Sequence, residues 1–95
     1  MFLGAYHFDG DPAALLDAYR RLMRGFPPGT SDLHVCVERP DGITVYDACP
    51  SRAVFTAFST SADFAGALRA AGLPSASVEP LGEVRSARLR SGVEA

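Results

Sequence analysis

A β-hairpin pattern in the middle of the chain is the feature that most restricts the possible fold. Residues 33–38 and 43–48 are rich in residues typical of strands, and Pro40-Asp41-Gly42 separates them. Pro presets the first turn position and Gly supplies a positive φ, so we expect a three-residue loop with a glycine bulge. A central hairpin leaves the segments on either side to complete a sheet.

The expected loop also fixes the expected pairing of the two strands. The pairs are Val37 with Val45, Cys36 with Tyr46, Val35 with Asp47 and His34 with Ala48. One face of the hairpin would then carry Leu33, Val35, Val37, Val45 and Asp47. The opposite face would carry His34, Cys36, Glu38, Thr44 and Tyr46.

The segment before the hairpin predicts a strand followed by a helix. Residues 2–8 form the strand pattern, and Asp11-Pro12 is a strong helix start because Asp caps free amides and Pro suits the first turn. Apolar residues follow at helical spacing: Leu15, Leu16, Tyr19, Leu22, Met23 and Phe26. We expect Gly25 to end this helix.

The segment after the hairpin predicts a broken helix and a last strand. Ser51 can cap residues 52–58, and Ser61 can cap a continuation that ends at Gly72. The last strand falls within residues 76–89, where Pro80 and Gly82 indicate an edge strand or a bulge.

The resulting order, β-α-β-β-α-β, predicts a ferredoxin-like α+β fold. Right-handed crossovers give a four-stranded antiparallel sheet in the order 4-1-3-2, with both helices on one face. We expect residues 1–95 to form a single domain with a short basic C-terminal tail, because Arg85, Arg88 and Arg90 outnumber Glu94 there.

The first strand is apolar on both of its sides, which predicts a cover for the second face of the sheet. Phe2, Tyr6 and Phe8 point one way, whereas Leu3 and Ala5 point the other. The helices cover one face only. The most economical cover for the other is a second copy of the chain, so we expect a homodimer with its sheets face to face.

The element order, the break near Ser59-Ser61 and the Ala-Gly-Leu-Pro exit at residues 71–74 resemble the dimeric α+β barrel superfamily. That superfamily includes antibiotic-biosynthesis-type monooxygenases and small isomerases and cyclases of aromatic metabolism. The resemblance implies a dimer that acts on or binds a small hydrophobic, aromatic or polyketide-like metabolite. Its haem-degrading branch uses Asn and Trp, and this chain has neither.

Composition excludes several other classes of function. The net charge is −2, which argues against nucleic acid as the main ligand, and no apolar run is long enough to span a membrane. A signal-peptide pattern is absent at the start, so we expect a cytoplasmic protein. Cys36 and Cys49 have no metal-type spacing, and we expect neither a disulfide nor a metal or other cofactor.

The candidate catalytic residues are His7, His34, Tyr46 and Asp47. We expect the first and third strands to run parallel, so that these residues gather at one edge of the sheet, where both helices begin. Two helix N-termini there would favour a small anionic ligand. Each residue also has a structural interpretation: the histidines and Asp47 as hydrogen-bonding groups, and Tyr46 as a core or interface aromatic.

Two classes of function therefore stay open at this stage. In an enzyme, His7 or His34 would be the general acid or base, oriented by a Tyr or Asp. In a non-catalytic dimeric module, the same chain would bind a small ligand or a partner protein. The hypothesis common to both is a pocket between sheet and helices, with apolar walls from Phe8, Leu15, Phe55 and Phe58.

Overall fold

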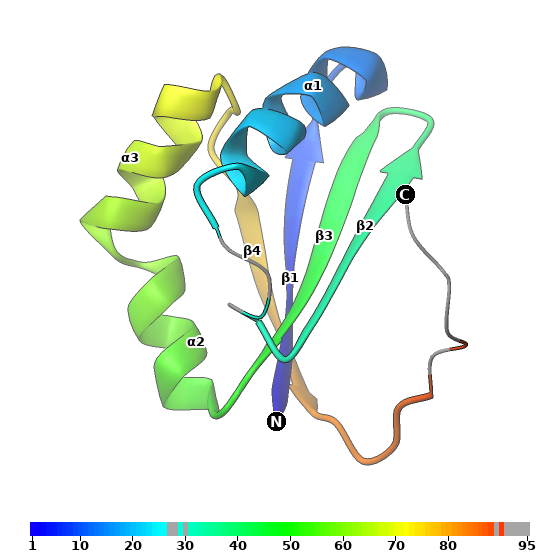
Figure 1. Ribbon diagram of the computed structural model, residues 1–95, viewed down its shortest axis with the longest axis vertical. Coiled ribbons are helices and arrows are strands. Elements are labelled where there is room, and N and C mark those ends of the chain that lie inside the picture. Colours follow the sequence, from blue (N-terminus) through cyan, green and yellow to red (C-terminus); the bar gives the residue numbers. More distant parts are fainter. Residues whose placement is uncertain (27–28, 30, 89, 91–95) are drawn as a thin grey trace.

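The predicted order of elements is confirmed, with the second helix divided in two. The computed structural model describes residues 1–26, 29, 31–88 and 90. Its elements are β1 (Phe2–Asp9), α1 (Pro12–Met23), β2 (Leu33–Arg39), β3 (Gly42–Cys49), α2 (Arg52–Ser59), α3 (Ala62–Ala71) and β4 (Ser77–Glu83) (Figure 1). Within this part of the chain, no helix is long and apolar enough to cross a membrane.

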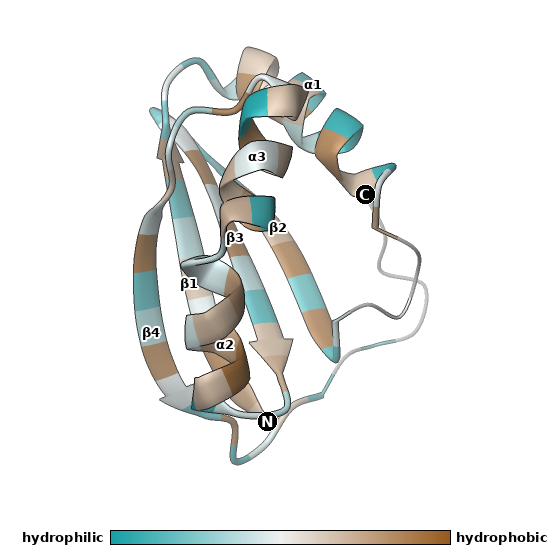
Figure 2. Cartoon of the chain, turned by 90° about the vertical axis from the view of Figure 1, so that its left-hand side faces the viewer, coloured by the Kyte–Doolittle hydropathy of each residue, from teal (hydrophilic) through white to brown (hydrophobic). Residues whose placement is uncertain are grey.

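The four strands form one antiparallel sheet in the order β2-β3-β1-β4, which is the predicted order. The three helices lie on one face of this sheet, as Figures 1 and 2 show from two directions. This arrangement is α+β and consistent with a ferredoxin-like architecture.

Local capping signals explain where the helices begin. The side chain of Asp11 accepts a hydrogen bond from the Ala14 amide, and Ser51 and Ser61 do the same for the amides three residues later. Gly72 ends α3 in the left-handed conformation, with φ of 88°. The three predicted helix starts are confirmed. The sequence could predict them because capping depends only on a few neighbouring residues.

The last strand lies at the edge of the sheet, as predicted. β4 pairs with β1, and the register shifts where Gly4 faces Pro80 and Leu3 faces Gly82. Pro cannot donate to a ladder and is tolerated at an edge or a bulge.

The predicted hairpin register is wrong by one residue. Arg39 faces Gly42 across a two-residue loop, so Cys36 pairs with Val45 and His34 with Asp47. Gly42 does not have a positive φ. Glycine is needed at this position because the backbone of Gly42 lies so close to β1 that a Cβ there would overlap the Phe8 carbonyl.

This shift exchanges the two faces of β2, because side chains alternate along a strand. His34 and Cys36 lie on the helix-covered face with Val45 and Asp47. Leu33, Val35 and Val37 lie on the other face, with Thr44 and Tyr46 of β3. We call this other face, which no described helix covers, the open face.

The predicted parallel direction of the first and third strands is also wrong. β1 pairs with β3 antiparallel, so the end of β1 lies beside the start of β3. The helix that follows β1 and the helix that follows β3 consequently begin at opposite ends of the sheet (Figure 1). The two helix N-termini do not converge on one site.

The core lies between the sheet and the helices. It contains the helix-facing residues of β1 and β3 together with apolar residues of all three helices and Leu73, which follows α3: Phe2, Tyr6, Phe8, Leu15, Ala18, Ile43, Val45, Phe55, Phe64, Leu68 and Leu73. Figure 2 shows both apolar and polar segments along β2, where the consecutive residues Val35, Cys36 and Val37 place apolar side chains on both faces of the strand. The apolar side chains Val35 and Val37 remain about two-fifths exposed on the open face, at 39% and 40%.

Candidate functional site

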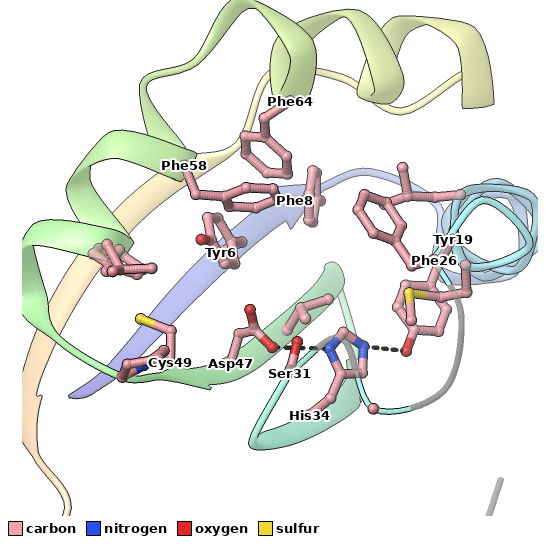
Figure 3. Close-up of a pocket in the computed structure, with 17 residues that line it drawn as sticks. Tyr6, Phe8, Tyr19, Phe26, Ser31, His34, Asp47, Cys49, Phe58 and Phe64 are labelled. Atoms are coloured by element: carbon pink, nitrogen blue, oxygen red, sulfur yellow. Dashed lines mark hydrogen bonds and ion pairs between the residues drawn. The ribbon is translucent and has the colours of Figure 1, made fainter. Parts of the chain in front are cut away.

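A pocket of about 410 Å³ opens between the helix-covered face of the sheet and the helices (Figure 3). Most of its wall is aromatic or aliphatic, with contributions from β1, β2, β3 and all three helices. The lining residues are Tyr6, Phe8, Tyr19, Leu22, Met23, Phe26, Gly29, Ser31, His34, Val45, Asp47, Cys49, Pro50, Val54, Phe55, Phe58 and Phe64. The predicted walls Phe8, Phe55 and Phe58 are among them, whereas Leu15 lies in the core instead.

Packing of α2 against β1 closes one end of this pocket. A Cβ on Gly4 would overlap the ring of Phe55, so the ring occupies the space that a larger residue would need. Phe55 then reaches Phe2 and Tyr6, at ring-centroid distances of 5.5 and 5.7 Å. The missing side chain at Gly4 therefore positions an aromatic wall beside Asp47, which pairs with Gly4.

Three polar side chains form a hydrogen-bonded chain along the pocket wall. The Tyr19 hydroxyl lies 2.6 Å from His34 Nε2, and His34 Nδ1 lies 3.2 Å from Asp47 Oδ1 (Figure 3). The rings of Tyr19 and His34 are nearly parallel, at 12° and 5.8 Å between centroids. We call these three residues the Tyr19–His34–Asp47 chain.

The direction of the protons in this chain follows from the chemistry of its ends. A carboxylate only accepts, so Nδ1 of His34 carries a proton and donates it to Asp47. Nε2 is then the acceptor for the Tyr19 hydroxyl. Burial, followed by the nearby Cys36 and Asp47, raises the pKa of Tyr19 to about 12, which keeps this hydroxyl a donor at neutral pH.

The chain is only partly shielded from water. The side chains of His34 and Asp47 are 26% and 19% exposed, and both line the pocket. A molecule in the pocket can therefore contact the chain, which is the arrangement that proton transfer to or from a ligand requires.

Two of the four predicted site residues meet here, and two do not. His34 and Asp47 are paired across β2 and β3 on the helix-covered face. His7 and Tyr46 lie on the open face, where His7 faces Thr44 and Tyr46 faces Ala5. The predicted gathering of all four at one edge is wrong because β1 and β3 are antiparallel and because β2 is shifted by one residue.

His7 forms a different hydrogen-bonded group on the open face. Its Nδ1 lies 3.0 Å from Thr44 Oγ1, and its Nε2 lies 2.9 Å from Glu79 Oε1. The Nε of Arg39 donates to the same Thr44 oxygen at 2.9 Å. This group links all four strands on the side of the sheet away from the pocket.

Tyr19 and Tyr6 line the pocket although neither is among the four candidate catalytic residues, and Ser31 is a further polar residue of the wall that the sequence did not indicate. Tyr19 occupies a helical position that reads as part of the apolar stripe, and Tyr6 reads as a core residue of the first strand. Their spacing from His34 and Asp47 carries no signal, because contact depends on how α1 and β1 pack on the hairpin. The sequence contains one signal for these residues. A Tyr in place of Phe in an apolar pattern indicates a hydroxyl that needs a hydrogen-bond partner.

Both cysteines remain free thiols. Burial is the main cause that raises the pKa of Cys36 and of Cys49, and the Cys49 thiol donates to the Ser51 carbonyl at 3.3 Å. The described residues contain no group of three or more His, Cys, Asp or Glu that could hold a metal ion.

Comparisons of the chain with protein-family models, with curated proteins and with solved structures find no match.

Proposed function

We propose that the pocket binds a small, neutral, largely apolar molecule and that the Tyr19–His34–Asp47 chain removes a proton from it. The chain carries this proposal, because it places a carboxylate-supported imidazole behind a hydroxyl at the wall of an apolar pocket. The volume of about 410 Å³ lies within the usual range of small-molecule sites, about 300–1,000 Å³.

The proton follows a balanced path in this proposal. The ligand gives its proton to the Tyr19 oxygen while the Tyr19 proton moves to His34 Nε2. His34 becomes an imidazolium, which the Asp47 carboxylate stabilises through Nδ1. The electron pair stays on the ligand, so the step needs no further reactant.

The charge of the pocket supports a neutral ligand. Among the described lining residues there is no Arg, and Asp47 is an acid. An anionic ligand would meet a like charge in a partly desolvated site. A planar molecule of one or two rings suits the aromatic walls.

A probe of proton removal tests this proposal. 5-Nitrobenzisoxazole is a neutral bicyclic compound that opens to a coloured phenolate when a base removes its ring proton. We expect turnover by the protein, and we expect His34→Ala to lower it by about 10²-fold, as loss of a general base does. His7→Ala is the matched control, because His7 lies on the open face. Equal turnover by His34→Ala and the parent would contradict the proposal.

A non-catalytic binding module is the second candidate. It is favoured by the mutual hydrogen bonding of Tyr19, His34 and Asp47, which satisfies these groups without any ligand. Probes that bind in the pocket with no turnover dependent on His34 would support this alternative.

We also propose that the chain forms a homodimer through its open face. Leu33, Val35 and Val37 succeed one another on this face, beside Tyr46 of the neighbouring strand. The polar side chains among them are already bonded within the chain, since His7 and Arg39 both contact Thr44. An apolar face with satisfied polar groups can be covered by a second copy at small cost. The resemblance to dimeric α+β barrels points to the same assembly.

A further inference from the structure

The Tyr6 hydroxyl is a donor that the Tyr19–His34–Asp47 chain does not use. Tyr6 is 4% exposed and lines the pocket, and its hydroxyl has no hydrogen-bond partner among the described residues. No side-chain oxygen in this part of the structure is both fully enclosed and without a partner, so the hydroxyl must border the pocket space. A polar group in an apolar wall is costly unless something pairs with it.

The surroundings of Tyr6 keep it in the donor form. Figure 3 shows the ring between Phe58 and the part of β3 that carries Asp47 and Cys49. Burial, and then these two residues, raise the pKa of Tyr6 well above its ordinary value. The hydroxyl therefore keeps its proton throughout the neutral range and offers it to an acceptor in the pocket.

We propose that Tyr6 donates this hydrogen bond to a carbonyl oxygen of the substrate, and that the substrate is a neutral, planar ketone with a C–H next to its carbonyl. This inference rests on the proposed function, since it needs the Tyr19–His34–Asp47 chain as the base. It adds the substrate class and a catalytic role for a residue outside that chain.

The two sets of residues perform complementary parts of one step. The base chain takes the proton from the carbon next to the carbonyl, and the C–H electron pair becomes the C=C bond of an enolate. The carbonyl π electrons move to oxygen, where the Tyr6 hydroxyl stabilises the new negative charge. The proton ends on His34 Nε2 by way of Tyr19, so charge and atoms balance.

The same pocket disfavours the closest competing ligand chemistry. A carboxylate would also accept from Tyr6, but it carries a full charge beside Asp47 with no described Arg in the wall. A ketone is neutral when it binds and develops charge only as the proton leaves. A donor that acts on developing charge accelerates the reaction rather than only tightening binding.

Hydrogen–deuterium exchange of 2-tetralone tests the inference. This bicyclic ketone, whose aromatic ring is planar, exchanges the protons next to its carbonyl, and ¹H NMR in D₂O follows the loss of their signal. We expect Tyr6→Phe to lower the protein-catalysed rate by about 10²-fold, the usual effect of removing one oxyanion donor. Tyr46→Phe, which removes a hydroxyl from the open face, is the matched control and should exchange at the parent rate.

Two further measurements separate the possible failures. Tyr6→Phe should retain turnover of 5-nitrobenzisoxazole that depends on His34, which shows that the base chain and the fold are intact. Exchange of 2-tetralone by Tyr6→Phe at the parent rate would overturn the role of Tyr6 and leave the proposed function standing. If neither probe depends on His34, the proposed function and this inference are both overturned.

Discussion

The two faces of the sheet carry the same chemical arrangement in different surroundings. On the helix-covered face, His34 lies between the carboxylate of Asp47 and the hydroxyl of Tyr19. On the open face, His7 lies between the carboxylate of Glu79 and the hydroxyl of Thr44. Each is an acid, an imidazole and a hydroxyl in series. The residue types alone therefore do not distinguish a site from a surface network.

Enclosure separates the two groups. The Asp47 side chain is 19% exposed and borders the pocket, whereas the Glu79 side chain is 56% exposed. Water screens a charge of the second kind and weakens its effect on a neighbouring imidazole. Only the enclosed group has apolar walls that can hold a molecule against it. The pocket, rather than the set of three residue types, therefore distinguishes the proposed site from the network on the open face.

The largest expected effect comes from neutralising the acid on each face, which tests whether the two groups differ in their effect on turnover. Asp47→Asn keeps the shape of the side chain but removes the charge that stabilises an imidazolium at His34. We expect turnover of 5-nitrobenzisoxazole to fall by about 10²-fold. Glu79→Gln makes the same change beside His7 and should leave turnover unaltered. Equal effects of the two variants would remove the distinction between the faces.

The second test concerns the open face as an interface. Val37→Glu puts a charge into the proposed dimer contact, and we expect the dimer to weaken by at least about 10²-fold because an unpaired buried charge is costly. Val54→Glu on α2 is the control, because its valine has similar exposure, 46% against 40%, on the other side of the sheet. Sedimentation at micromolar concentration gives the result. A parent chain that sediments as a monomer would contradict the homodimer.

The third test concerns the wall that Gly4 makes possible. Gly4→Ala places a methyl group where the Phe55 ring lies, so we expect a loss of about 1–3 kcal/mol of stability from overpacking. Gly66→Ala in α3 has no close neighbour at its Cβ and should gain about 0.5–1 kcal/mol from helix propensity. Urea unfolding measures both. Equal stability of Gly4→Ala and the parent would show that the ring moves freely.

The smallest expected effect is on stability at alkaline pH. The folded pKa of Tyr19, about 12, lies above its ordinary value of 10.0. A raised pKa means that the folded state holds the proton more tightly, so the contribution is fully present below pH 10 and disappears as pH rises towards about 12. Tyr19→Phe should lose less stability than the parent over this interval in urea unfolding. Parallel decline of the two proteins would contradict the assignment.

Local signals allowed much of the fold to be predicted. Asp11, Ser51 and Ser61 cap their helices as expected, because capping involves only the next three residues. Pro80 and Gly82 marked the edge strand and its irregular register for an equally local reason. The order of elements then followed, and with it the order of the strands in the sheet.

The candidate site could be predicted only in part. His34 and Asp47 were named, and they meet on facing strands. Tyr19 and Tyr6 were absent from the predicted set because a tyrosine in an apolar pattern reads as core. His7 and Tyr46 were included because the direction of one strand and the register of another were misjudged. Each of these errors moves a side chain to the wrong end or the wrong face of the sheet.

The sequence by itself determined the elements, their order and the residues that start each helix, since these depend on short-range contacts. Only the tertiary structure decided which side of β2 faces the helices. That choice depends on one residue of loop length, because Gly42 belongs to β3, where it lies against the Phe8 carbonyl of a strand more than thirty positions away, and pairs with Arg39. Side chains alternate along a strand, so this one-residue difference places His34 in the pocket with Asp47 and Tyr19 rather than on the open face.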